Sequence, residues 1–460
     1  MRRNVLTLSG ATLAVLPITV AIATGACGAT KPKLKAPAAG IDGGAVVGAP
    51  VQNQQGQQVA ASTGISADSE LSGDAKSSYD RGFAAWMNGD LQGAKSAFMD
   101  AASRAPSAGG PRYSLGCVLE RLGDTQGALD AYRASYTANS KYEVAMGAYA
   151  ILLASSGRGT DAEQFLNGKG ASDSVRLMTY LAEVKSIEGD SPGCQNLAQQ
   201  ALTKQPDFKD AMVVIARDYY RTHRFDLAKY ALQAILDGSE DGSIPPRDKG
   251  NPEGLLMRAL IEREQSDRKD ALRDFDAASQ KRPDLFEAYI NLGEMKLEAG
   301  NASEAQAPLE KAVRYAPNVA VAHLDLGDCY RLLGRAGDAK SEFDKVARMD
   351  STLAGVHYDL GLLYLFSPNV PGASGQDDQI AKAIQEFETF KSMRNAKVKG
   401  PGDDVDELLS TAKRKQNELQ IKKQAAAAAS AAPPPAPAGS GAASAAAPAT
   451  SAAPAASAPK

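Results

Sequence analysis

The sequence has little of what enzymes use for chemistry. Its 460 residues include three histidines, four cysteines and one tryptophan. No H-E-x-x-H, G-x-S-x-G or phosphate-binding loop spacing is present, so the usual arrangements for zinc, for a serine nucleophile and for nucleotide phosphates are missing. We therefore expect a protein that is not an enzyme, with no catalytic residue, no metal site and no cofactor.

The chain also lacks an excess of charge of either sign. It has 51 Lys and Arg residues against 54 Asp and Glu residues. A nucleic-acid-binding protein needs a basic face to neutralise phosphates, and the charge balance gives no sign of one. The first 70 residues and the last 36 differ in composition from the middle of the chain. We expect no nucleic-acid partner, and a folded centre between two flanks of another kind.

Charge is nearly absent from the N-terminus after two arginines. Arg2 and Arg3 precede an uncharged stretch that ends in Thr24-Gly25-Ala26-Cys27. A positive start, an apolar run and small residues are typical of an export signal. The pattern resembles the signal peptide of bacterial lipoproteins, which implies a signal over residues 1–26 and a lipid on Cys27. Cleavage without a lipid and an uncleaved spanning anchor are the alternatives, and all three export the chain.

The remaining cysteines are too few and too far apart for a disulfide framework. After Cys27 the chain has only Cys117, Cys194 and Cys329, an odd number with no C-x-x-C spacing. We expect each of these three to be a small buried residue.

The middle of the chain repeats with a period of 34 residues. This step separates Gly293, Gly327 and Gly361, and likewise Ala94, Ala128 and Ala162. Within one unit the landmarks follow in a fixed order, shown in full by Gly82, Gly89, Ala94, Phe98, Ala101 and Pro106. Small residues allow two helices to cross closely, a glycine ends the first helix in a left-handed turn, and a proline ends the second. A period of this length indicates stacked repeats.

These landmarks resemble the tetratricopeptide repeat, over about residues 75–395. The resemblance implies an all-α fold, a right-handed superhelix of about nine helical hairpins. The units run approximately 75–108, 109–142, 143–174, 175–208, 209–251, 252–285, 286–319, 320–353 and 354–395. A last helix over residues 403–424 has acidic residues at its start and basic ones at its end, and we expect it to cap the array. Residues 27–74 and 433–460 have no periodicity, so we expect a disordered tether and a disordered Ala/Pro-rich tail.

Two units are lengthened by insertions, residues 237–251 and 367–379. Insertions in a repeat array often project from one face and contact ligands, and tolerated surface loops are an equally good explanation.

Two histidines occupy the same place in consecutive units, since His323 and His357 are 34 residues apart. The family keeps a packing residue at this place, so we expect packing rather than a metal site. His223 lies at the turn between two helices, where we expect it to be solvated.

Members of the family bind partners on the concave surface, which the first helix of each unit lines. At the corresponding positions this sequence has Tyr79, Phe83, Trp86, Tyr113, Arg217, Tyr220, Arg263, Arg331 and Tyr358. We predict that these residues form a protein-binding groove for a ligand that is apolar and mixed in charge. Some relatives clamp carboxylates with a Lys–Asn–Asn–Lys–Arg set, which is missing here. An open alternative is that flanking segments cover the aromatic residues.

The lipoprotein-like signal, the array and the tail together resemble the tetratricopeptide lipoproteins of adventurous gliding motility. This resemblance implies a lipid-anchored periplasmic scaffold that binds other envelope proteins, as part of a gliding motility complex. Because Gly28, not aspartate, follows Cys27, we expect the outer membrane as the location. Two rival hypotheses are a chaperone-like assembly factor for outer-membrane secretins, pili or barrels, and an accessory of peptidoglycan enzymes.

Overall fold

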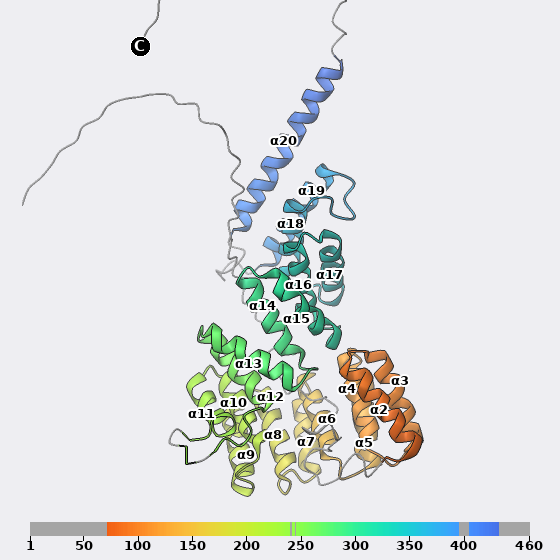
Figure 1. The fold of residues 1–460 in the computed structure, drawn as a ribbon, viewed down its shortest axis with the longest axis vertical. Coiled ribbons are helices and arrows are strands. Elements are labelled where there is room, and N and C mark those ends of the chain that lie inside the picture. The colour runs from red at the N-terminus through yellow and green to blue at the C-terminus, as the bar shows by residue number, and fades with distance from the viewer. Residues whose placement is uncertain (1–70, 240–241, 244, 395–403, 432–460) are drawn as a thin grey trace, which may run out of the picture.

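The computed structural model describes residues 71–239, 242–243, 245–394 and 404–431, and these residues form helices and no strand (Figure 1). The first ten helices are α2 (Gly73–Met87), α3 (Leu91–Arg104), α4 (Gly110–Arg121), α5 (Thr125–Ala138), α6 (Glu143–Ser155), α7 (Gly159–Gly168), α8 (Val175–Ile187), α9 (Ser191–Lys204), α10 (Lys209–Arg221) and α11 (Phe225–Leu236). The others are α12 (Pro252–Glu264), α13 (Arg268–Lys281), α14 (Phe286–Glu298), α15 (Ala302–Tyr315), α16 (Ala320–Leu332), α17 (Ala336–Met349), α18 (Gly355–Phe366), α19 (Gln376–Met393) and α20 (Val405–Ala431). The predicted signal peptide with Cys27, the tether and the tail lie outside the described residues.

The helices from α2 to α19 form nine consecutive hairpins, and each helix packs on the next along the chain. Each hairpin falls within one of the nine units predicted from the 34-residue period. The all-α repeat fold is therefore confirmed. The third hairpin has the shortest helix, α7, which ends at Gly168, where the sequence of the unit departs from the others.

Within a hairpin, a glycine of the first helix receives a large side chain of the second. A Cβ at Gly82 would lie 2.6 Å from Phe98 Cδ1, and a Cβ at Gly327 would lie 2.5 Å from Phe343 Cε1. Both phenylalanines are fully buried. Since no real Cβ approaches a carbon so closely, only glycine lets these helices cross at this distance.

The turn inside each hairpin has a fixed local chemistry. Gly89 and Gly123 have φ of +72° and +77°, in the left-handed region that glycine adopts without strain. The aspartate that follows caps the second helix, because the Asp90 and Asp124 carboxylates accept from backbone N–H groups three residues on, at 2.9 Å each. His223, predicted to lie in such a turn, has the same conformation with φ of +57°.

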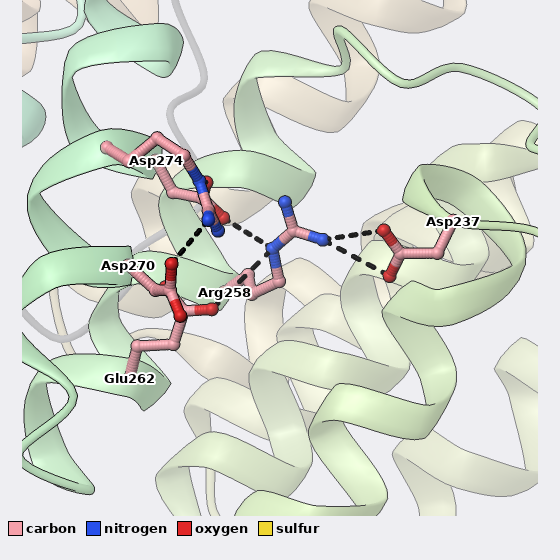
Figure 2. A network of polar contacts seen from close by, with 6 residues as sticks. Asp237, Arg258, Glu262, Asp270 and Asp274 are labelled. Atoms are coloured by element: carbon pink, nitrogen blue, oxygen red, sulfur yellow. Dashed lines mark hydrogen bonds and ion pairs between the residues drawn. The ribbon is translucent and has the colours of Figure 1, made fainter.

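The insertion at residues 237–251 is fixed to the sixth hairpin by a network of charges (Figure 2). Arg258 of α12 donates to both carboxylate oxygens of Asp237, at 2.9 and 3.1 Å, and also donates to Asp274 of α13. Glu262 lies one turn after Arg258, with 3.9 Å between Oε1 and Nε. The network joins the start of the inserted loop to both helices of the next unit.

The last helix, α20, covers the end of the array. Val405, Leu409 and Ala412 are buried against α19, and Lys413 is paired with Glu388 at 3.0 Å. The helix continues to Ala431, beyond the predicted end at residue 424. Alanines dominate these extra residues, and alanine has the highest helix propensity of all residues, which accounts for the extension.

The array curves so strongly that its beginning returns to its middle. In Figure 1 the first two hairpins lie beside the segment that joins α15 to α16. The Tyr315 hydroxyl donates to the backbone carbonyl of Met87 at 2.7 Å, across 228 positions of sequence. None of the helices in the described part of the chain is long and apolar enough to span a bilayer.

Candidate functional site

The three aromatic residues predicted to anchor an open groove are buried. Trp86 exposes 1% of its surface, Tyr79 3% and Phe83 8%. The ring of Tyr79 lies 5.2 Å from that of Phe98, between centroids, and its hydroxyl is 2.9 Å from Ser114 Oγ of the next hairpin. The expectation of an accessible aromatic surface is therefore wrong, because these side chains fill the space that small residues such as Gly82 leave. A role in partner binding stays a prediction.

The other tyrosines of the predicted groove are also involved in packing. Tyr113 lies between Tyr132 and Tyr142, each 5.8 Å away between ring centroids, and burial raises its pKa. The Tyr358 hydroxyl donates to the Asp404 carboxylate at 3.0 Å, just before α20. Tyr220 is half-buried, with its ring 5.8 Å from that of Phe225. The tyrosines therefore form no open strip on the concave surface.

The three arginines of the predicted groove are all ion-paired. Each binds a carboxylate on its own or a neighbouring first helix: Arg217 with Glu183 at 2.7 Å, Arg263 with Glu294 at 2.8 Å and Arg331 with Asp328 at 2.6 Å. The concave side is thus mixed in charge. Only Arg217 and Trp86, of the nine predicted residues, belong to the site described next.

The closure of the array is a narrow contact that we call the seam, formed by Met87, Gly89, Arg121 and Gly123 on one side and by Phe286, Arg314, Tyr315 and Asn318 on the other. Besides the bond from Tyr315, the Asn318 amide donates to the Arg121 carbonyl at 3.3 Å. The Arg121 guanidinium lies 4.3 Å from the Phe286 ring centroid and 5.9 Å from that of Trp86. Two hydrogen bonds and a cation–π contact at about 1 kcal/mol each make the seam weak compared with the packing inside hairpins.

A continuous band of polar and aromatic side chains crosses the inside of the closed turn. We call it the inner belt, and it consists of Trp86, Arg121, Glu183, Arg217, Glu253, Arg282, Phe286 and Glu287. Arg217 bridges Glu183, at 2.7 Å, to Glu253, at 3.8 Å. Glu253 is also paired with Arg282, which ends α13. The belt therefore joins the fourth, fifth and sixth hairpins to the seventh, and through the seam to the first two.

Burial and neighbouring charges shift the proton affinities of the belt in opposite directions. Burial raises the pKa of Glu287 to about 7, against the opposing effect of the Arg121 and Arg282 guanidinium groups. Glu183 shows the reverse, because Arg217 and Arg221 outweigh its burial and lower its pKa. The belt thus contains one carboxylate held firmly ionised and another, at the seam, that titrates near neutral pH.

Several belt atoms are buried without a hydrogen-bond partner among the described residues. The unpartnered donors are Trp86 Nε1, Arg121 Nη2, Arg217 Nε, and Arg282 Nε and Nη2, and the unpartnered acceptors are Glu253 Oε2 and Glu287 Oε2. Each such atom costs about 1–3 kcal/mol, and the great majority of buried polar atoms in proteins have a partner. Their concentration along one band identifies the inner belt as the candidate site, because a ligand with both donors and acceptors would satisfy them.

Sequence reasoning missed most of the belt. Arg121, Arg282, Phe286 and Glu287 lie outside the positions that line a tetratricopeptide groove, at the ends of helices rather than along them. Only the fold brings these residues together, and no spacing in the sequence marks them.

The two histidines of equivalent position make equivalent contacts. His323 Nδ1 lies 2.5 Å from Glu342 Oε2, and His357 Nδ1 lies 2.6 Å from Glu386 Oε2, in each case on the second helix of the same hairpin. His323 is buried and His357 half-buried. Among the residues that the structure describes, no group of three or more His, Cys, Asp or Glu is placed to hold a metal ion.

Three parts of the chain match family models of known repeats. Residues 79–144 and 256–305 match one model described as tetratricopeptide repeat, and residues 296–352 match a second model with the same description. A comparison with curated proteins gives no match.

Among solved structures, the chain is similar to the APC/C hetero-tetramer Cut9–Hcn1, at 12% identity and a TM-score of 0.49, over 70% of this chain and 62% of that chain. It is also similar to a tetratricopeptide repeat protein from Parabacteroides merdae, at 14% identity and a TM-score of 0.29, over 74% of this chain and 98% of that chain. A third is PilF of Pseudomonas aeruginosa, at 18% identity and a TM-score of 0.38, over 55% of this chain and 99% of that chain. The chain spans less than two thirds of the first of these proteins.

Proposed function

We propose that this tetratricopeptide repeat chain is a scaffold for protein–protein interaction and that an extended segment of its partner binds along the inner belt. Tetratricopeptide repeats are generally non-catalytic and bind protein partners. The observation that carries the proposal is the set of buried, unpartnered polar atoms on the inside of the closed turn. An extended backbone offers carbonyl acceptors and N–H donors in alternation, which is the mixture that these atoms require.

The belt also sets the chemistry of the partner's side chains. Its unpartnered donors come from Trp86 and three arginines, and they outnumber its unpartnered acceptors. A segment with carboxylate or amide side chains would fit this excess of donors, and the Trp86 and Phe286 rings add apolar contact area.

We further propose that the scaffold is exported, anchored by a lipid on Cys27 to the outer membrane, and that its partners are envelope proteins of the gliding motility machinery. This part of the proposal is supported by the sequence from Arg2 to Cys27, which lies outside the described residues, and by the resemblance in architecture stated above. Metabolic labelling with a fatty acid tests the anchor. The full chain should take up the label and Cys27→Ser should not, whereas an unlabelled native chain would contradict a lipid anchor.

Affinity purification of the full chain from detergent-solubilised envelopes tests the binding role. Glu287→Gln keeps the shape of a belt side chain and removes its charge, so partner recovery should fall roughly tenfold when a charge-assisted hydrogen bond is lost. Glu304→Gln is a matched control on an exposed face of α15, where the side chain is paired only with Lys296. Equal recovery with both variants would contradict binding along the belt. Recovery in a fixed ratio indicates a machine component, and transient recovery indicates an assembly factor.

A further inference from the structure

The inner belt is enclosed in the structure described here. Trp86 exposes 1% of its surface, Arg217 4% and Glu287 7%. A polypeptide cannot reach atoms that are so deeply buried unless part of the array moves. The question is therefore which contact gives way.

The seam is the contact with the fewest interactions. Successive hairpins are joined by extensive packing of helix on helix, whereas the seam depends on the bonds from Tyr315 to Met87 and from Asn318 to Arg121. These two bonds join positions 228 and 197 residues apart. In a repeat array each unit packs mainly on its neighbours, so small rotations at several units add up to a large movement between distant ones.

The side chains at the seam are also poorly satisfied in the closed state. Trp86 Nε1, Arg121 Nη2 and Glu287 Oε2 are buried and have no hydrogen-bond partner among the described residues. Opening the seam would expose all three atoms to water or to a partner and remove this cost. The closed state is thus held by few bonds and opposed by buried polar atoms at the same place.

The geometry points to a gate: we propose that the seam opens and closes between the first two hairpins and the segment from α14 to α16, and that it controls entry of the partner to the inner belt. The gate rests on the proposed function, since it regulates the same site. In the closed state the bonds from Tyr315 and Asn318 compete with the partner. In the open state Trp86, Arg121 and Glu287 face the entering segment.

Trp86 reports on this gate directly, because it is the only tryptophan in the chain and lies at the seam. The probe is acrylamide, a neutral quencher of tryptophan fluorescence, applied to the full chain without any partner. Tyr315→Phe and Asn318→Ala each remove one seam hydrogen bond, so each should raise the open population about fivefold. Acrylamide quenching should rise in each variant and rise further in the double variant, with emission shifted to longer wavelength.

Tyr330→Phe is the matched control. Its hydroxyl donates to Glu310 at 3.0 Å, between neighbouring hairpins far from the seam, so quenching of Trp86 should stay at the native value. Far-ultraviolet circular dichroism confirms that each variant is folded. If quenching in the folded double variant equals that of the native chain, the seam does not open through these bonds and the gate is refuted.

Partner recovery then separates the gate from the proposed function. With a functioning gate, the double variant recovers several-fold more of the partner than the native chain does, and Tyr330→Phe recovers the same amount. If quenching rises while recovery is unchanged, access is not controlled at the seam and the gate is refuted, whereas binding along the belt stands. Loss of the Glu287→Gln effect refutes the belt as the binding site irrespective of the quenching result.

Discussion

The close approach of the two helices in the eighth hairpin gives the sharpest test of the fold. Gly327 of α16 faces Phe343 of α17, and a Cβ added there would lie 2.5 Å from Cε1 and 2.7 Å from Cδ1. Phe343 has no exposed surface, so its ring cannot turn aside into solvent. Gly327→Ala should therefore push the helices apart.

The magnitude follows from two opposing effects. Overpacking a buried site costs about 1–3 kcal/mol, while replacing glycine by alanine inside a helix gains about 1 kcal/mol. The net destabilisation should be roughly 1–2 kcal/mol. Gly337→Ala in the same hairpin is the control, because a Cβ there would be 3.7 Å from Pro371 Cγ, an ordinary contact. That variant should be neutral or stabilised by up to about 1 kcal/mol.

Urea unfolding followed by circular dichroism measures both variants, and amide exchange in α16 and α17 localises the effect to this hairpin. The same substitution on a Phe343→Ala background supplies a double-mutant cycle. With the ring removed, Gly327→Ala should no longer be destabilising. A Gly327→Ala protein as stable as the native one, or one whose cost persists without the ring, would show that the two helices do not cross as described.

Three further predictions concern packing and pH. Ala305 is fully buried where two helices meet, so Ala305→Leu should cost about 1–3 kcal/mol by overpacking, measured by thermal unfolding. Leu409 of α20 is buried on the end of the array, so Leu409→Ala should cost about 2–5 kcal/mol and make α20 more sensitive to limited proteolysis, with unchanged proteolysis counting against a cap. Burial, with Asp274 nearby, raises the pKa of Glu262 to about 7 from 4.5, so the folded state binds a proton that the unfolded state has released. Stability should therefore fall as the pH rises from 4.5 through 7, and Glu262→Gln should flatten this slope in unfolding experiments across that range.

The hairpins could be predicted from the sequence because their determinants are local. Gly89 ends a helix and lies in a left-handed turn, Asp90 caps the next helix, and Gly82 receives Phe98 sixteen positions later. All of these act within one 34-residue unit and recur in the next. A pattern that repeats in register therefore predicts the number of hairpins and their boundaries.

The prediction of the binding residues was much weaker. The expectation for Trp86 placed it on an open concave surface, whereas the structure buries it beside Arg121. The family pattern states which face of a helix points inward, but it does not state what lies on the other side of the interior. Arg217 was correctly placed on the inside, and its partner Glu183 comes from the preceding unit, which is still a local relationship.

The seam and the inner belt were decided only by the tertiary structure. Whether Tyr315 meets Met87 depends on the rotation between successive hairpins, summed over the units that separate them. A small change in each rotation would move the two residues far apart, and no single unit contains the sum. The sequence by itself therefore determined the repeating hairpin, whose contacts lie within about 34 residues, while the accumulated curvature determined which distant units meet and which side chains they enclose.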